Sequence, residues 1–386
     1  MTERSWREAE LLRLARRHHN TKRVYLLVDP LQGKHIPVSP GEALSMLRSL
    51  GNRLREAAPE TDTVVGFAET ATAVAAVCAE RLGGECFYIH TTRERFPREG
   101  NAPVLEFLEE HSHAAEQTLL CAALEERLSR SKGLALIDDE YSTGKTLINI
   151  LTRLRERFPG LRDIPVTAVS VIDRMSDARR AELEQLGVRT VSLLRLPFRD
   201  YTEEVLRYAI EAAYPPAPSA ERYIRYETAG AVPDLRRGAG IGEVFAACEA
   251  MSAEMIVRER KELTGKSVLV LGTEECMLPG LLLADALEGS GFARSVRFHA
   301  TTRSPIGICE EEGYPIRNGC RLRGFYDPDR ATFLYDLAAY DTAFVLTDAR
   351  EEDAVRAGAE ALFDALAEYG CRELRVIRLP EGPGEK

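Results

Sequence analysis

Hydrophobic and polar positions alternate along the chain in two patterns, short apolar runs and longer segments of helical period. Short runs rich in β-branched residues predict strands over 24–29, 63–67, 86–91, 133–140, 165–173 and 189–196. Segments with an apolar residue every three or four positions predict helices over 41–57, 71–82, 115–130, 144–157, 177–186 and 202–213. Strands that alternate with helices predict an α/β fold with a parallel sheet.

The same alternation returns after a break. Residues 215–240 mix Pro, Gly and charged residues and predict a linker. Beyond it the pattern predicts helices over 242–258, 279–289 and 351–369, and strands over 267–272, 295–301, 342–348 and 373–379. We therefore expect one α/β domain over 1–214 and a second over 241–386.

The two predicted domains share local sequence. Gly66-Phe-Ala-Glu69 has a counterpart in Gly272-Thr-Glu-Glu275, and His90-Thr-Thr-Arg93 has one in His299-Ala-Thr-Thr-Arg303. Asp139 follows His90 by 49 residues, and Asp348 follows His299 by the same 49. Because both acids end an apolar strand that leads into a helix, we expect an internal duplication of one α/β unit. Shared spacing by chance is the alternative.

Composition narrows the class of protein. The 386 residues include 51 Lys plus Arg and 61 Asp plus Glu, which gives a net charge of −10. This balance argues against a protein that holds nucleic acid by bulk charge. The apolar runs are far shorter than the roughly 18 residues of a membrane helix. The charged amino-terminal segment lacks the apolar core of a secretion signal, and the eight cysteines form no CxxC pair, so we expect a cytoplasmic protein with reduced cysteines.

The sharpest chemical signal lies between Gly133 and Thr146, in the sequence GLALIDDEYSTGKT. An apolar strand ends in Asp138 and Asp139, and a Ser/Thr/Gly turn then leads into a helix. Gly144 allows close approach of the backbone to an anion, and the helix start offers N–H groups to a phosphate. The adjacent carboxylates can accept hydrogen bonds from ribose hydroxyls, directly or through Mg²⁺. The spacing is not that of a Walker A loop.

The segment IDDEYSTGKT, 137–146, resembles the phosphoribosyl pyrophosphate (PRPP) motif of type I phosphoribosyltransferases. The resemblance covers roughly 25–215, including an Asp173-Arg174 pair like that of orotate phosphoribosyltransferases, and it implies a parallel sheet with an amino-terminal hood at about 20–60. It implies that Asp138 and Asp139 are catalytic, face the ribose hydroxyls and hold Mg²⁺. The implied PRPP-binding set is Asp138, Asp139, Glu140, Ser142, Thr143, Gly144, Lys145, Thr146, Ala68, Glu69 and Thr70.

Two parts depart from the family pattern. Purine-type members carry an acid where this chain has Ser142, and the lysine-rich catalytic loop of orotate enzymes is absent. Arg93 follows the strand that leads to this loop. We expect it to be a catalytic residue that stabilises the leaving pyrophosphate as a bidentate donor.

Two polar clusters are candidates for binding the acceptor. Lys34 and His35 follow Gly33 in the segment implied to be the hood, where a surface turn is the alternative. His111 and His113 alternate with other polar residues in EEHSH, and the sequence leaves open acceptor recognition, a metal site or a solvated turn.

The segment HATTRSP, 299–305, resembles the signature of the TRSP domain, and RGFYDPDRATFLYDL, 323–337, fits the same family. This domain follows a distinctive phosphoribosyltransferase domain in stress-associated gene clusters of the tellurium-resistance type, with a suggested role in nucleoside biosynthesis. Thr302, Arg303 and Ser304 predict an anion site in the second domain, or a group that completes the site of the first domain from across an interface. A helix cap with Pro305 at the first helical position is the alternative. The acidic run TDAREED, 347–353, is expected to repel phosphate, so we expect a single PRPP site and a degenerate second unit.

The resemblance implies a phosphoribosyltransferase, that is, a pentosyltransferase of the glycosyltransferase class. It would use PRPP and Mg²⁺ to ribosylate an unknown base-like acceptor. A PRPP-sensing regulator that binds nucleic acid is the alternative reading, although the acidic charge speaks against nucleic acid as a partner. A pyrophosphokinase like PRPP synthetase is a further alternative. The resemblance also allows a homodimer, because type I phosphoribosyltransferases often dimerise.

Overall fold

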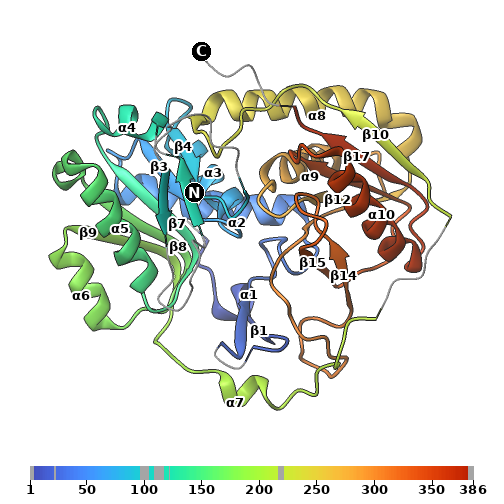
Figure 1. Ribbon diagram of the computed structural model, residues 1–386, viewed down its shortest axis with the longest axis horizontal. Helices are drawn as coiled ribbons and strands as arrows, with labels where there is room; N and C mark the ends of the chain where they lie inside the picture. Colours follow the sequence, from blue (N-terminus) through green and yellow to red (C-terminus); the bar gives the residue numbers. More distant parts are fainter. Residues whose placement is uncertain are drawn as a thin grey trace.

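The chain folds into two parallel β-sheets, one in each half, joined by a shared layer of helices (Figure 1). The computed structural model describes residues 4–20, 23–95, 104–107, 117–120, 122–215 and 221–380. Figure 1 shows the first half, in blue to green, beside the second half, in yellow to red.

The first sheet has six strands in the order β11-β4-β3-β7-β8-β9, and only β11 runs antiparallel to its neighbour. Its strands are β3 (Thr63–Gly66), β4 (Phe87–His90), β7 (Leu134–Tyr141), β8 (Val166–Asp173), β9 (Val188–Arg195) and β11 (Ala239–Gly240). The order of the five parallel strands reverses between β3 and β7, so the ends of these two strands form the switch point at which such sheets bind ligands.

The second sheet has five parallel strands in the order β10-β17-β16-β12-β13. They are β10 (Ile224–Thr228), β12 (Ser267–Gly272), β13 (Ser295–Ala300), β16 (Thr342–Thr347) and β17 (Leu374–Arg378). The order β13-β12-β16-β17 repeats the order β4-β3-β7-β8 of the first half. These sheets confirm the predicted α/β fold with a second α/β unit, and their common strand order supports the predicted duplication.

Antiparallel hairpins extend this correspondence. Between β4 and β7 lies the hairpin of β5 (Val104–Phe107) and β6 (Gln117–Leu120), and between β13 and β16 lies that of β14 (Gly319–Arg323) and β15 (Ala331–Tyr335). The helices preceding and following the first strand also correspond. They are α2 (Pro40–Ala57) and α3 (Thr72–Leu82) in the first half, and α8 (Ile241–Leu263) and α9 (Leu278–Ser290) in the second.

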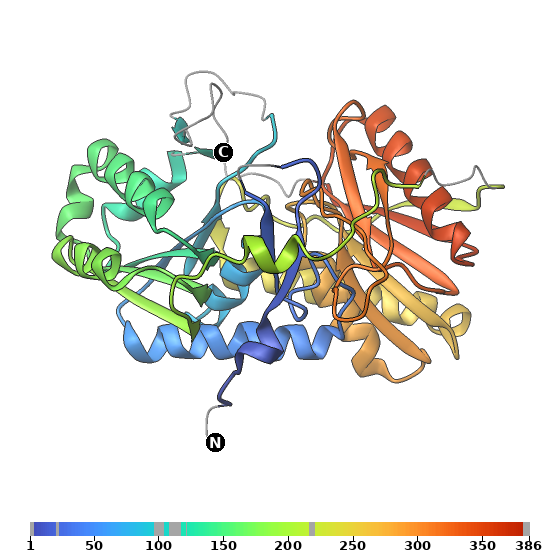
Figure 2. The same cartoon turned by 90° about the horizontal axis from the view of Figure 1, so that it is seen from below.

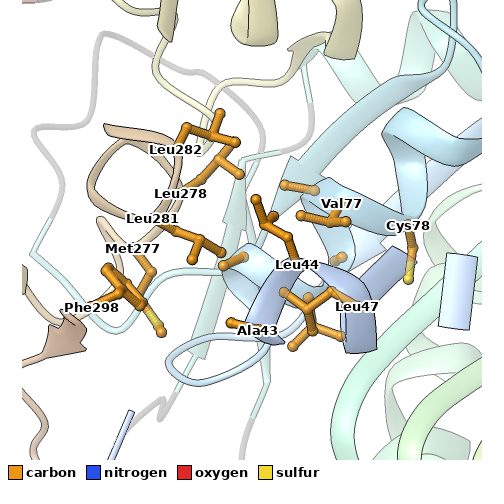
Figure 3. Close-up of a cluster of buried hydrophobic side chains, with 14 of the residues drawn as sticks. Ala43, Leu44, Leu47, Val77, Cys78, Met277, Leu278, Leu281, Leu282 and Phe298 are labelled. Carbon is orange, nitrogen blue, oxygen red and sulfur yellow. The ribbon is translucent and has the colours of Figure 1, made fainter. Parts of the chain in front are cut away.

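These four helices form the layer between the sheets. Helix α3 is buried from Thr72 to Ala79 and α9 from Leu278 to Ala284, as expected of helices that are apolar on every side. Helix α2 packs against α9, and α8 packs against α3, which is a reciprocal pairing of equivalent helices. Figure 3 shows Leu44 and Leu47 of α2 facing Leu281 of α9, and Figure 2 shows α2 running toward the second half. One hydrophobic core thus spans both halves.

The outer faces are covered by the remaining helices. These are α4 (Ala122–Leu128), α5 (Lys145–Arg157), a 3₁₀ turn η1 (Pro159–Asp163) and α6 (Asp177–Gln185) in the first half, and α10 (Glu352–Glu368) in the second. The amino-terminal α1 (Glu8–Leu11) leads into an antiparallel hairpin of β1 (Arg13–Arg16) and β2 (Tyr25–Val28). This hairpin contacts α7 (Thr202–Val205), near the middle of Figure 2.

Several expected elements differ in the structure. The helix expected over 115–130 is in part strand β6, because Gln117–Leu120 pairs with Val104–Phe107, and only α4 remains helical. The helix expected over 202–213 ends as α7 at Val205, since the chain beyond it joins the second half through the amide of Glu211, which donates to Ile308.

The segment 215–240, expected as a linker, contributes β10 to the second sheet and β11 to the first, so its described part ties the halves together. No helix begins at Pro305, so the helix-cap interpretation of the TTRSP segment is wrong. Within the described part of the chain, no helix has the length and apolar character needed to cross a membrane.

Candidate functional site

The two acids of the phosphate-loop sequence lie at the end of β7, beside the end of β3. Both carboxylates are half-buried, and the Asp139 amide donates to Asp138 Oδ1 at 2.9 Å. Burial and the neighbouring Asp139 charge raise the pKa of Asp138 well above its usual range. An uncompensated pair of acids at a switch point suits a ligand that brings hydroxyl donors or a cation.

The turn after β7 depends on Gly144. Its φ is +70°, and it caps α5 at the amino-terminal end. A Cβ on this residue would lie 2.7 Å from Met175 Sδ and 2.8 Å from Arg179 Cγ. Only glycine therefore allows this turn to begin α5, and the first N–H groups of that helix have no partner further back in the helix. The side chains of Thr143 and Thr146 are exposed beside them.

A buried arginine on the next strand pairs with Glu140, which follows the two acids. Arg174, at the end of β8, donates from Nε to Glu140 Oε1 at 2.9 Å and from Nη2 to the Tyr25 hydroxyl at 3.2 Å. Asp173 instead accepts from Arg180 Nε at 2.9 Å. The two residues are neighbours in sequence but contact different groups. Arg174 joins β7 to the amino-terminal hairpin, whereas Asp173 pairs with Arg180 of α6.

The loop from Gly66 to Thr70 lies at the same edge of the sheet, because Gly66 pairs with Ile137. The Ala68 amide donates to Thr91 Oγ1 at 2.8 Å. Arg93 reaches the Ala68 carbonyl with Nε at 3.4 Å. The structure therefore brings together three features singled out from the sequence, namely the loop 66–70, the acids of β7 and Arg93.

Glu69 is buried and paired with Lys34, whose Nζ lies 2.6 Å from Oε1. Burial opposes ionisation of Glu69, but Lys34 and Arg303 outweigh it and lower the pKa of the carboxyl. Lys34 Nζ also donates to the carbonyls of Glu274 at 2.7 Å and Thr301 at 2.9 Å. Since all three donors of Lys34 are engaged, this geometry gives it a role in joining the halves rather than in meeting an acceptor.

His35 is also buried, and burial with the nearby Lys34 charge lowers its pKa to about 3. It is therefore neutral at ordinary pH. His111 and His113 lie outside the described residues.

Arg303 of the TTRSP segment points to the first half. Its Nε lies 2.7 Å from Glu274 Oε2 and 3.8 Å from Glu69 Oε2, and its Nη2 donates to Glu94. Arg330 binds the same Glu94 and Glu274. The carboxylates around Arg303 make a separate anion site at this residue unfavourable and place its guanidinium beside loop 66–70.

The neighbours of Arg303 have backbone roles. Thr302 exchanges backbone hydrogen bonds with Phe333, and the Ser304 carbonyl accepts from the Tyr335 hydroxyl at 2.7 Å. These contacts fix the TTRSP segment against β15, so that Arg303 is held in place at the junction of the halves.

The polar contacts between the halves are reciprocal. Glu69, after β3, accepts from the Arg303 amide at 3.3 Å, and Glu275, after β12, accepts from the Arg93 amide at 2.6 Å. Each glutamate also pairs with a buried base from the segment before the preceding helix, Lys34 for Glu69 and Arg236 for Glu275. The duplicated units therefore face each other through equivalent residues.

Asp29 is a site residue that the sequence analysis did not single out. It is buried at the end of β2, and its Oδ1 accepts from the Leu31 amide at 2.9 Å, while Oδ2 has no hydrogen-bond partner among the residues that the structure describes. Burial and the charge of Asp139 raise its pKa to about 7. The available signal was that Asp29 ends an apolar strand, as Asp139 does. Its place beside Asp139 depends on how the hairpin folds over the sheet.

Comparison with known proteins identifies two domains. Residues 11–195 match the model of a phosphoribosyl transferase family, PRTase_2, and residues 241–366 match the TRSP domain, described as lying carboxyl-terminal to PRTase_2. No match is found among curated proteins.

Solved structures of phosphoribosyltransferases also resemble part of the chain. Orotate phosphoribosyltransferase from Aeropyrum pernix is 19% identical, with 43% of this chain and 76% of that chain covered and a TM-score of 0.26. Adenine phosphoribosyltransferase from Leishmania tarentolae is 19% identical, with 50% and 88% covered and a TM-score of 0.34. The APRTase from Giardia lamblia, complexed with 9-deazaadenine, is 17% identical, with 48% and 94% covered and a TM-score of 0.35.

At these TM-scores the assignment rests on the two family models, whose order along the chain is the order expected from the IDDEYSTGKT and HATTRSP segments. Residues 11–195 therefore form a phosphoribosyltransferase domain of the PRTase_2 family, and residues 241–366 form the TRSP domain that lies carboxyl-terminal to it.

Proposed function

We propose that the first half binds PRPP at the end of β7 and transfers its phosphoribosyl group to a base-like acceptor. The observation that carries this proposal is the half-buried pair Asp138 and Asp139 next to a glycine-initiated helix, at the switch point of the sheet. Carboxylates suit the ribose hydroxyls, and the helix start suits the 5′-phosphate. In this assignment residues 1–214 form the catalytic domain and 241–386 the TRSP domain.

The residues around PRPP would act by positioning and by charge. The amides and hydroxyls from Ser142 to Thr146 would hold the phosphate, while loop 66–70 and the Arg93 guanidinium would hold the pyrophosphate. The Lys34–Glu69 pair would fix the shape of that loop, because a buried pair of 2.6 Å leaves little freedom. Such a site lowers the barrier mainly by aligning the acceptor with the ribose C1 and by stabilising the charge of the leaving group.

Asp138 and Asp139 fit a Mg²⁺ ion. Mg²⁺ prefers oxygen ligands and is usually held by one or two protein carboxylates together with substrate oxygens. The raised pKa of Asp138 reflects burial and the neighbouring charge of Asp139, and a cation would offset that charge. When bound with PRPP, the ion would neutralise charge on the pyrophosphate.

The acceptor would enter beside the amino-terminal hairpin. Asp29 offers an unpartnered carboxyl oxygen there and has a pKa of about 7, so it can accept a hydrogen bond or a proton from a heterocyclic N–H. We assign acceptor contact to Asp29 in preference to Lys34. A product of this kind would be nucleotide-like, in keeping with nucleoside biosynthesis within a stress-associated, tellurium-resistance-type system.

The test is Mg²⁺-dependent consumption of PRPP by the full chain, followed by pyrophosphate release across a panel of purine and pyrimidine bases. The proposal predicts release with at least one base and loss of release in Asp138→Asn/Asp139→Asn. Salt-sensitive RNA or DNA binding that changes with PRPP, without pyrophosphate release, would favour a regulator instead. Formation of PRPP from ATP and ribose 5-phosphate would favour a pyrophosphokinase.

A further inference from the structure

A cavity of about 350 Å³ opens at the carboxyl ends of β12, β16 and β17, in the second half. It lies at the switch point of the second sheet, between β12 and β16. The segment 232–235 and the turn 275–279 form two of its walls, and His90 of the first half reaches it from β4. A volume of this size falls within the range of clefts that hold drug-sized ligands.

This cavity occupies the place that the proposed PRPP site has in the first half. Gly66 of β3 pairs with Ile137 of β7, and Gly272 of β12 pairs with Leu346 of β16. Asp139 follows Ile137 by two positions, and Asp348, which lines the cavity, follows Leu346 by two. The duplicated fold thus provides a second concave site at the same sheet edge.

The charges in the second site differ from those in the first. Asp348 Oδ2 lies 2.6 Å from Arg236 Nη1, and Asp348 Oδ1 accepts from the Tyr326 hydroxyl. Although burial opposes ionisation, these partners lower the pKa of Asp348. Its charge is therefore balanced inside the protein, and the ligand need not bring a cation or a ribose diol to meet it.

Two arginines supply positive charge at the cavity wall. Arg378, at the end of β17, is half-buried and donates from Nη2 to the Arg350 carbonyl at 2.8 Å. The Arg350 guanidinium lies 3.6 Å from Asp234. The acidic residues 351–353 were expected to repel phosphate, but their side chains are exposed in the first turn of α10 and do not line the cavity. An anionic group can therefore be accommodated next to Arg378.

Three further polar residues of the wall offer hydrogen-bond acceptors, in addition to the hydroxyls of Thr72 and Thr228. Asp234 and Glu275 present carboxylates that Arg236 shares at 3.4 and 3.3 Å. His90 places Nδ1 2.8 Å from the Thr91 carbonyl, which fixes Nε2 as the acceptor nitrogen. Burial lowers the pKa of His90, so the ring is neutral at ordinary pH. A matching ligand carries N–H or O–H donors as well as an anion.

The apolar part of the wall includes Val232, Met277, Leu278 and Leu379. Figure 3 shows Met277 and Leu278 at the start of α9, beside the shared core. Because these side chains belong to buried, packed elements, they offer a firm apolar surface for a flat ring.

We propose that this cavity is a second ligand site and binds a nucleoside monophosphate. The heterocycle would lie against the apolar wall with its N–H donors toward Asp234, Glu275 and His90, and the phosphate would lie at Arg378. This site is separate from the proposed PRPP site and does not depend on phosphoribosyl transfer.

The test is calorimetric titration of the full chain with AMP, GMP, CMP and UMP, and with the matching nucleosides. The titrations are made in the Asp138→Asn/Asp139→Asn background, because the first site could itself hold a nucleotide. In that background, one of the monophosphates should bind with one site per chain, and its nucleoside should bind at least 10-fold more weakly. Arg378→Ala should weaken binding at least 10-fold, and Thr228→Trp, at an exposed position on the cavity wall, should abolish it.

Thermal unfolding verifies that Arg378→Ala and Thr228→Trp are folded. If one of them does not fold, the other suffices for the test. The proposal is overturned if no monophosphate binds the Asp138→Asn/Asp139→Asn chain at 1 mM. It is equally overturned if nucleoside and monophosphate bind alike, or if folded Arg378→Ala and Thr228→Trp chains bind as well as their parent.

Discussion

The two halves use one strand order to build two different sheet edges. In the first, Asp138 and Asp139 end β7 without a basic partner among the hydrogen bonds and ion pairs of the described residues, and burial keeps the pKa of Asp138 high. In the second, the equivalent Asp348 is held by Arg236 and its pKa is low. The first sheet edge can therefore receive a polyhydroxylated or cationic ligand. At the second edge, the acid is already neutralised by an arginine of the protein.

The turns that follow the acids differ in the same sense. Gly144 starts α5 with exposed hydroxyls nearby, whereas α10 begins with the acidic residues Glu352 and Asp353. A helix start with N–H groups favours phosphate, but acidic side chains in the first turn compete for the same groups. The two halves therefore share a strand order but differ in the turn that follows the equivalent acids.

The largest expected effect concerns the acids. Asp138→Asn/Asp139→Asn should reduce PRPP-dependent pyrophosphate release about 100-fold or more, because each charge-assisted hydrogen bond contributes about 1.5–3 kcal/mol. Its thermal midpoint should stay the same or rise, since a like-charged pair is removed. Asp348→Asn is the matched variant and should retain turnover at 20 °C while unfolding more easily. Equal loss of turnover in both would contradict a functional difference between the halves.

The next effect concerns the buried bases that join the halves. Lys34→Met and Arg236→Met should each lower the free energy of unfolding by about 3–5 kcal/mol, because each removes the buried cation that is paired with a buried carboxylate. Denaturant titration measures this. Arg130→Met, which removes an exposed pair with Glu126, is the control and should change stability by less than about 0.5 kcal/mol. If all three variants have the same free energy of unfolding, the reciprocal pairs do not hold the halves together.

Asp29 gives a pH-dependent difference. Its pKa is about 7 in the folded protein against 3.8 ordinarily, so the folded state binds more protons between these values and loses stability as pH rises through this range. The free energy of unfolding of Asp29→Asn should therefore exceed that of the wild type by up to about 4 kcal/mol at pH 8, as measured by denaturant titration. At pH 4 the two proteins should have the same free energy of unfolding. Asp329→Asn, at an exposed position, should show no such trend. A constant difference across pH would refute the assignment.

The smallest effect concerns the turn. Gly144→Ala should cost about 1–3 kcal/mol, since it combines a positive φ with a Cβ 2.7 Å from Met175 Sδ, and it should weaken PRPP binding. Gly160→Ala, where a Cβ meets no atom within 4 Å, should change stability by about 0.5 kcal/mol or less. Urea melts and PRPP titrations report both. A Gly144→Ala protein that behaves like Gly160→Ala would show that the turn does not need glycine.

Much of the fold could be predicted from the sequence because buried parallel strands are short, continuous apolar runs. Strands β3, β7, β8 and β12, and helices α3, α5 and α6, lie within a residue or two of their expected bounds. The pairs β5–β6 and β14–β15 were missed, since these strands are short and antiparallel and are stabilised by pairing with each other.

The candidate site could be predicted only where function and local sequence coincide. Asp138, Asp139 and Gly144 lie within one short segment of the chain, so a sequence motif could predict them. The contacts of Lys34 could not be predicted, because its partners Glu69, Glu274 and Thr301 are distant in sequence. Asp29 was overlooked for the same reason, since its raised pKa arises from burial under a separate hairpin.

The most direct test of the central claim is the number of PRPP molecules bound per chain, measured by calorimetry with and without Mg²⁺. We predict one Mg²⁺-dependent site in the wild type, none in Asp138→Asn/Asp139→Asn, and one in Arg378→Ala. Two sites in the wild type, or undiminished binding after both aspartates are changed, would contradict the account that only the first half retains a PRPP site.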